Sequence, residues 1–362
     1  MTLESKNKSA LSTKKGVVKP QNILKSSIKR IQNNKAKNIS VSRYVKNITK
    51  GDVSFLSRGI TLVESQNSDD TKKATQLLEA CLPYANKSVR IGITGVPGVG
   101  KSTFIEAFGK HLTALGKKVA VLAIDPSSSV NKGSILGDKT RMANLVKDKM
   151  AFIRPSPSGT TLGGVAKSTR ESILLCEAAG FDIIIVETVG VGQSETSVHN
   201  MVDFFLLLKL AGAGDELQGI KRGIIEMADA IVINKADGDN LKAAQLAKAD
   251  FERALHLYPA KENNWQPKVL TCSATEIKGI ETIWQLIADY LELTKGNDFF
   301  DINRKNQNKY WLENTIKQQL INNFEQHPTI MEAFNTQLKA VNNLETTPFM
   351  AAQKLLTTYY KK

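Results

Sequence analysis

The chain has 362 residues, enough for one large α/β domain with accessory helices. Its formal net charge is +14, but residues 1–50 hold thirteen Lys or Arg against a single acid, Glu4, so they carry +12 of that charge. A nucleic-acid-binding domain spreads basic charge over its folded surface, so a basic tail of this kind argues against nucleic acid as a partner.

Cysteine and hydropathy patterns exclude further classes of protein. The three cysteines lie far apart with no C-x-x-C spacing, and the four histidines are equally scattered, so we expect reduced core thiols and no Cys/His metal site. No apolar run approaches the ~18 residues of a membrane span, and the N-terminus lacks the apolar segment of a signal peptide. We expect a cytoplasmic protein with no membrane span; import into an organelle remains open because the arm is poor in acids.

The pattern along the chain predicts four regions. Residues 1–41 are a basic low-complexity arm, 42–88 are N-terminal helices, 89–295 are an α/β domain, and 296–362 are a helical region. In the α/β domain, the predicted strands are 89–94, 118–124, 150–154, 181–186, 230–234 and 268–272. The predicted helices between them are 104–115, 169–179, 241–257 and 281–293. Continuous apolar strands with intervening helices indicate a doubly wound, mostly parallel sheet whose ligand lies at the carboxyl ends of the strands.

The C-terminal region reads as a helical appendage. Residues 303–338 carry an apolar stripe along one helix face, and 349–360 predict a second, short helix. The stripe consists of Trp311, Leu312, Ile316, Leu320, Ile321 and Phe324. Such a helix either packs back on its own domain or pairs with another subunit, and we favour a homodimer.

A phosphate-binding loop follows the first predicted strand. The segment Gly95-Val-Pro-Gly-Val-Gly-Lys-Ser-Thr103 fits G-x-x-x-x-G-K-[ST] between a strand and a helix, which identifies a P-loop NTPase. Its backbone N–H groups would surround a phosphate, Lys101 would reach the β- and γ-phosphates, and the Ser102 hydroxyl would bind Mg²⁺. The residues expected to bind the nucleotide here are Gly95, Val96, Pro97, Gly98, Val99, Gly100, Lys101, Ser102 and Thr103.

Two later segments predict guanine specificity. Asn234-Lys235-Ala236-Asp237 follows a predicted strand and matches the N-x-x-D loop of GTPases, where a carboxylate accepts from the guanine N1–H and exocyclic amine. Adenine does not offer this pair of donors, and leaving buried groups unpaired discriminates by ~10⁴. Ser273-Ala274 follows the last strand and resembles the second base loop, with a backbone N–H for the guanine O6. A helix-capping Ser is the alternative interpretation.

Acids at strand ends predict a magnesium site. Asp125 follows the strand next to the phosphate loop, Glu187 follows the strand 181–186, and Asp138 lies in the polar loop between them. With Ser102 they make the expected metal ligands, some of them through water. Gly190 could give its N–H to the γ-phosphate, and Gln193 is a weak candidate for positioning the attacking water. Lys101 and Glu187 are the other expected catalytic residues.

Taken together, these motifs resemble one family, the GTPases that accompany methylmalonyl-CoA mutase, also labelled arginine/ornithine transport kinases. The most discriminating segment is Gly212-Ala-Gly-Asp-Glu-Leu-Gln-Gly-Ile-Lys221, which other P-loop proteins lack. The resemblance covers about residues 43–295 and leaves out the arm. The segments that carry it, besides this one, are Gly95–Thr103, Asp125-Pro-Ser-Ser, Gly137-Asp-Lys-Thr-Arg-Met142, Val186-Glu-Thr-Val-Gly-Val-Gly-Gln-Ser-Glu195 and Asn234-Lys-Ala-Asp237.

The resemblance implies a homodimeric GTPase that binds GTP or GDP with Mg²⁺. Its partner would be the adenosylcobalamin-dependent methylmalonyl-CoA mutase, for which it would couple hydrolysis to cofactor loading and protection. Residues 212–221 would form a third switch loop facing the partner, with Lys221 as a further catalytic cation. Alternative functions are a metallochaperone GTPase, which would need a Cys/His site, and a transport-linked kinase, which would need an acceptor pocket.

Overall fold

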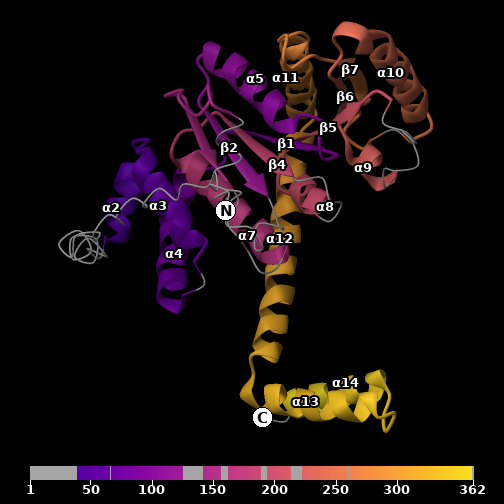
Figure 1. Cartoon of the computed structure of the whole chain (residues 1–362). Coiled ribbons are helices and arrows are strands. Elements are labelled where there is room, and N and C mark those ends of the chain that lie inside the picture. The colour runs from indigo at the N-terminus through magenta and orange to yellow at the C-terminus, as the bar shows by residue number, and fades with distance from the viewer. Residues whose placement is uncertain are drawn as a thin grey trace, which may run out of the picture. The chain divides into compact units, whose positions relative to one another are not determined.

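A central parallel sheet organises the chain. The computed structural model describes residues 39–65, 67–124, 142–155, 162–188, 194–212, 222–259 and 261–360, and residues Val41–Lys362 form one compact unit. The strands are β1 (Val89–Gly95), β2 (Val119–Ile124), β3 (Ala151–Arg154), β4 (Ile183–Thr188), β5 (Phe204–Leu210), β6 (Ala230–Asn234) and β7 (Lys268–Thr271). Their order is β3-β2-β4-β1-β5-β6-β7 (Figure 1).

Every pairing between these strands is parallel, so their carboxyl ends share one edge of the sheet. The burial patterns explain this choice, because β4 and β6 are buried along their whole length, as strands covered on both faces must be. The central strand β1 lies between β4 and β5, with Ile93 opposite Glu187 on one side and Leu206 on the other. The phosphate loop therefore leaves the middle of the sheet.

Helices cover both faces of the sheet, which confirms the doubly wound fold. They are α5 (Lys101–Ala114), α7 (Leu162–Ala178), α8 (Ser194–His199), α9 (Arg222–Met227), α10 (Leu241–Leu255) and α11 (Ile280–Gly296), with the 3₁₀ helices η1 (Leu82–Tyr84) and η3 (Gly238–Asn240). The side chains of α5 and α11 pack with Ile93 and Leu206 in one core. Those of α9 and α10 pack with Leu207 and Ile231 on the opposite face.

Two elements differ from the sequence-based expectation. The strand β5 was not predicted, although Phe204-Phe-Leu-Leu-Leu-Lys-Leu210 is buried over six of its seven residues. A short apolar run of this kind has no periodicity that separates a buried strand from a buried helix. The helix predicted over 303–338 is two helices, α12 (Phe299–Glu325) and α13 (Pro328–Asn342), because Pro328 has no N–H to continue α12 and instead starts α13.

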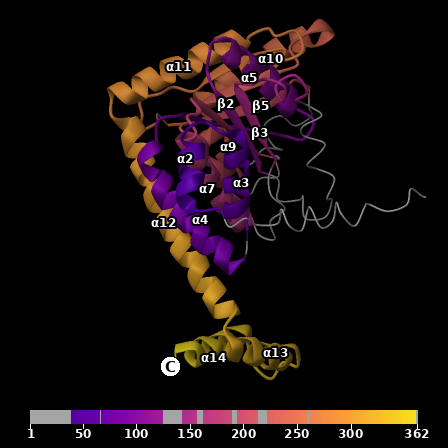
Figure 2. The same ribbon diagram turned by 90° about the vertical axis from the view of Figure 1, so that its left-hand side faces the viewer.

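The N-terminal helices pack against α7. They are α2 (Val41–Ile48), α3 (Val53–Val63) and α4 (Ser68–Cys81). Asp52 caps α3, since its carboxylate accepts hydrogen bonds from the N–H groups of Ser54 and Phe55. The contacts of α3 and α4 with α7 bring this layer onto the sheet (Figure 2).

The C-terminal helices begin at a buried polar contact. On α12, the Arg304 guanidinium is 5% exposed and donates to both carboxylate oxygens of Asp203, at 2.8 and 2.7 Å. It also donates to the carbonyls of Asn86 and Ser88 at the start of β1. Beyond α12, α13 packs on α14 (Pro348–Tyr360). Among the described residues, no helix is long and apolar enough to cross a membrane.

Removing the Arg304 side chain should destabilise the fold strongly. Arg304→Met leaves the Asp203 carboxylate, 4% exposed, without its cation, and breaking a buried pair on one side costs about 3–5 kcal/mol. The double variant Arg304→Met/Asp203→Asn should recover part of this loss because no charge is left unpaired. Urea unfolding of the two variants measures both values; equal stability of Arg304→Met and the original chain would show that the pair contributes nothing.

Candidate functional site

The phosphate loop connects β1 to α5 through glycines that no other residue could replace. Gly98 and Gly100 have φ angles of 82° and 91°, in the left-handed region. A Cβ at Gly100 would lie 2.9 Å from Nδ2 of Asn234, and one at Gly95 would lie 2.6 Å from the Leu208 carbonyl oxygen. The loop is thus tight both in its own backbone and against β5 and β6.

Lys101 is the first residue of α5 and lies inside the loop. Its side chain is largely buried, and Nζ donates to the carbonyl oxygens of Gly95 at 2.7 Å and Val96 at 3.3 Å. Burial lowers the pKa of Lys101, while the negative charges of Glu187 and Glu195 act in the opposite direction. The ammonium is therefore held at the carboxyl edge of β1, where the phosphates of a nucleotide are expected.

Glu187 lies near the carboxyl end of β4, beside the phosphate-loop strand. It is 8% exposed and pairs in register with Ile93 of β1 and Ala123 of β2. The next residue, Thr188, donates from its hydroxyl to that of Thr94 at 2.8 Å, which ties β4 to β1 at this point. The structure therefore brings Glu187 and Lys101 to the same edge of the sheet.

Glu195 was not among the predicted site residues. It lies in the first turn of α8, is 1% exposed, and its charge acts on the pKa of Lys101. The sequence does show an acid shortly after Gly190 and Gln193, in what the structure makes the first turn of α8. An acid at such a position usually indicates only a favourable interaction with the helix dipole, so it did not suggest a site residue. Its burial near Lys101 depends on packing that local sequence does not encode.

The predicted base loop is bonded directly to the phosphate loop. Asn234, the last residue of β6, is 1% exposed and donates from Nδ2 to the Val99 carbonyl at 2.8 Å. Lys235, with a φ of 57°, donates from Nζ to the Gly98 carbonyl at 3.0 Å. On the other side, the Cys272 thiol donates to Oδ1 of Asn234 at 3.3 Å. The two motifs, more than 130 residues apart, thus form one rigid corner.

Asp237 and Ser273 meet at the outer end of this corner. The Ser273 hydroxyl donates to Oδ2 of Asp237, and the Thr275 hydroxyl donates to the same oxygen at 3.3 Å. Ser273 also accepts from the Glu276 N–H at 3.1 Å within a turn, but it caps no helix, since α11 begins at Ile280 with Gly279 as its N-cap. Its own N–H donates to the Lys278 carbonyl at 3.1 Å. The N–H of Ala274, the residue predicted to meet the guanine O6, has no acceptor among the described residues.

Of the other predicted site residues, Ser102 and Thr103 lie in the first turn of α5, while five lie outside the described part of the chain. Asp125, Asp138, Gly190, Gln193 and Lys221 belong to this group. Within the described residues, no cluster of three or more His, Cys, Asp or Glu could hold a metal ion.

Comparison with known proteins relates nearly the whole chain to GTPases. The family model described as methylmalonyl Co-A mutase-associated GTPase MeaB matches residues 56–329. A probable GTPase of Mycobacterium tuberculosis is 49% identical over 306 residues, which cover 84% of this chain and 91% of that protein.

A relative from Mus musculus is described as methylmalonic aciduria type A homolog, mitochondrial. It is 43% identical over 329 residues, covering 88% of this chain and 79% of its own. Among solved structures, one described as an LAO/AO transport system kinase superposes with a TM-score of 0.72 at 39% identity, covering 90% of this chain and 99% of that one. The family match over residues 56–329 includes both the phosphate loop and the predicted base loop.

Proposed function

We propose, from the premise that this chain belongs to the methylmalonyl-CoA mutase-associated GTPase family and hydrolyses GTP, that it serves an adenosylcobalamin-dependent methylmalonyl-CoA mutase as a chaperone. Hydrolysis would be coupled to loading the mutase with its cofactor and to protecting it. The observation that carries the proposal is the family match over residues 56–329 together with a base loop bonded to the phosphate loop through Asn234 and Val99. The mutase link is supported by the family description and by the name of the mouse relative.

The nucleotide would bind along the carboxyl edge of the sheet, with its base at Asp237 and its phosphates at Lys101. Mg²⁺ would be held by Ser102, at the start of α5, and by Glu187, directly or through water, with Asp125 and Asp138 as further ligands. Hydroxyl and carboxylate oxygens are the donors that Mg²⁺ prefers, so the residues present fit this ion. The ion would neutralise charge on the phosphates, and Lys101 would do the same from the other side.

Intrinsic turnover should be slow, because the sequence offers only Gln193, a weak candidate, to position the attacking water, and the further cation, Lys221, would act when the partner is bound. Unassisted GTPases of this superfamily turn over at ~10⁻⁴ to 10⁻² s⁻¹. A partner that places one further cation can raise the rate by ~10³ or more. The protein would therefore act as a switch whose site is completed by the mutase.

The experiment that tests this function measures GTP hydrolysis with and without purified mutase. We expect stimulation in the original chain and in Lys242→Ala, an exposed lysine of α10 that serves as the control. Lys221→Ala should bind GTP and turn over at the basal rate but show no stimulation. Absence of any mutase effect on the original chain would contradict the partner assignment, and full stimulation of Lys221→Ala would remove Lys221 from the mechanism.

A second copy of the chain is the proposed partner of the C-terminal helices. Large apolar side chains remain exposed along them, with Leu312 63%, Phe334 51% and Phe349 76% exposed. Others are Ile302, Ile316, Leu320, Ile321, Met331, Leu338, Met350, Leu356 and Tyr360. A series of this length over three consecutive helices supports an interface rather than ordinary surface.

Charge placed on this surface should separate the subunits. Leu320→Glu/Phe334→Glu should give a monomer that still binds GTP, because both side chains are exposed in the single chain and far from the base loop in sequence. Leu246→Glu, an equally apolar and exposed position on α10, is the control and should remain dimeric. Light scattering measures the mass; a monomeric original chain at micromolar concentration would contradict the homodimer.

A further inference from the structure

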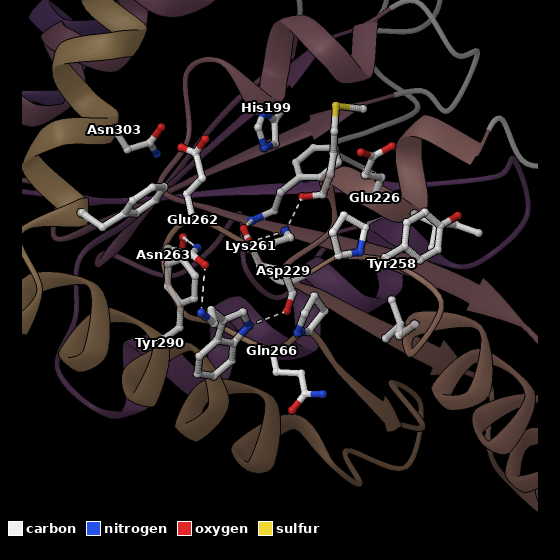
Figure 3. A pocket seen from close by; sticks show the side chains of 18 of the residues that line it. His199, Glu226, Asp229, Tyr258, Lys261, Glu262, Asn263, Gln266, Tyr290 and Asn303 are labelled. Carbon is white, nitrogen blue, oxygen red and sulfur yellow. Dashed lines mark hydrogen bonds and ion pairs between the residues drawn. The ribbon is translucent and has the colours of Figure 1, made fainter.

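A second cavity, of about 1070 Å³, opens at the amino edge of the sheet (Figure 3). Its lining includes Asp203, Asp229 and Pro267, the residues that immediately precede β5, β6 and β7. Since all strands are parallel, this edge is opposite to the one that carries the phosphate loop. The cavity is therefore separate from the nucleotide site.

Several polar groups that line this cavity bond to one another, and its one lysine, Lys261, is already paired with a carboxylate. Lys261 donates from Nζ to the carbonyls of Met227 at 3.1 Å and Ala228 at 2.8 Å, and to Oδ1 of Asp229 at 2.8 Å. Trp265 donates from Nε1 to the Asp229 carbonyl at 2.9 Å. All three ammonium donors are thus used, so Lys261 offers no free cation to an incoming ligand.

Two carboxylates of the lining have no such compensation. Glu226, near the end of α9, and Glu262, in the segment before β7, make no ion pair or hydrogen bond with any residue that the structure describes. In Figure 3, they lie on either side of the His199 ring. Asp203 and Asp229 are paired with Arg304 and Lys261, so the cavity carries the net negative charge of these two glutamates.

The rest of the lining is aromatic, aliphatic, or neutral and polar. Tyr258, Trp265, Tyr290 and Phe299 supply ring surfaces. His199 packs edge-on against Phe205, with 5.6 Å between ring centroids, and its nitrogens have no hydrogen-bond partner in the described part of the chain. Burial lowers the pKa of His199, so the imidazole is neutral near pH 7 and adds no positive charge.

We propose that this cavity binds a small organic cation, with one or two amine or guanidinium groups on an aliphatic stem. The charged groups would lie at Glu226 and Glu262, and the stem would pack on the aromatic rings, which also attract cations through their faces. An anion would be repelled by the two uncompensated carboxylates, and a neutral apolar molecule would form no ion pair with them. The chemistry of the lining thus selects against both other classes.

Two helices connect this site to the opposite edge. The cavity is lined by His199 at the end of α8 and by Glu226 and Met227 at the end of α9. In the sequence, α8 directly follows Gly190 and Gln193, and α9 directly follows Lys221. A ligand here would therefore contact the ends of two helices, one that follows Gly190 and Gln193 and one that follows the proposed switch loop 212–221.

Histidine NMR of the full chain, with its four histidines labelled, tests the proposal using 1,4-diaminobutane as the probe. Adipate carries the same four-carbon stem with reversed charge and serves as the ligand control. We expect diaminobutane to shift the His199 resonance saturably, with a dissociation constant on the order of 1 mM for so small a ligand. Adipate should leave it unchanged. The His199 resonance is assigned with His199→Gln.

The variants identify the charged groups. Glu226→Gln/Glu262→Gln keeps the shape of both exposed side chains and should weaken binding about tenfold, as expected for two partly screened ion pairs. Glu292→Gln, an exposed glutamate of α11, should bind as the original chain does. The proposal is overturned by unchanged affinity in the double variant, by an equal response to adipate, or by no shift of His199 at ~20 mM diaminobutane, well above the expected constant.

Discussion

Replacing Asp237 with Asn should convert a GTP-specific protein into one that prefers xanthosine triphosphate. The carboxylate is oriented by the hydroxyls of Ser273 and Thr275, so it presents an acceptor where the guanine N1–H and amine would lie. An amide offers a donor there, which suits the extra carbonyl of xanthine and leaves the guanine amine unpaired. Changing the match of buried hydrogen-bonding groups alters a specificity ratio by ~10⁴.

Titration of both proteins with the two nucleotides measures the change, and ATP is included for the original chain. Asp239→Asn is the matched control, because Asp239 is exposed in η3, the short helix that follows Asp237, and makes no hydrogen bond with any described residue that would orient it toward a base. It should keep the original preference for GTP. Equal affinity of the original chain for ATP and GTP, or undiminished GTP binding by Asp237→Asn, would contradict the base assignment.

Replacing Lys101 with Ala should reduce GTP hydrolysis by about 10²–10³ at saturating nucleotide, the usual loss when one preorganised donor to a developing charge is removed. Burial of the ammonium is what makes the effect large, since a charge in a water-excluded position acts more strongly than an exposed one. In the structure, Nζ is held by the Gly95 and Val96 carbonyls, two residues that belong to the phosphate loop itself. Nucleotide binding should weaken as well.

The control for this variant is Lys110→Ala on the same helix. Lys110 is exposed and pairs with Asp148 at the surface, so its loss should cost at most about 1 kcal/mol of stability and leave hydrolysis unchanged. Single-turnover hydrolysis at several GTP concentrations separates the rate from the binding. A Lys101→Ala protein that hydrolyses GTP at the original rate would place the catalytic cation elsewhere.

Local sequence determined much about this protein. The phosphate-loop motif was predicted between a strand and a helix, where the structure has it, because its glycines, its lysine and the apolar strand before it are contiguous and their backbone requirements are local; only the start of the helix differs, at Lys101 rather than 104. Six of the seven strands were predicted from apolar runs, and their alternation with helices was enough to predict the doubly wound sheet. The base loop was recognised for the same reason, since Asn234 and Asp237 lie three residues apart at the end of one such run.

Tertiary structure alone decided the contacts between distant segments. The bond from Asn234 to the Val99 carbonyl spans 135 residues, and the burial of Glu195 depends on how α8 packs on the sheet. The strand β5 was missed because a short apolar run is equally compatible with a buried helix, and only its pairing with β1 and β6 selects the strand. The cavity containing Glu226 and Glu262 joins five separate segments. Such features follow from strand order and packing, which no single stretch of sequence encodes.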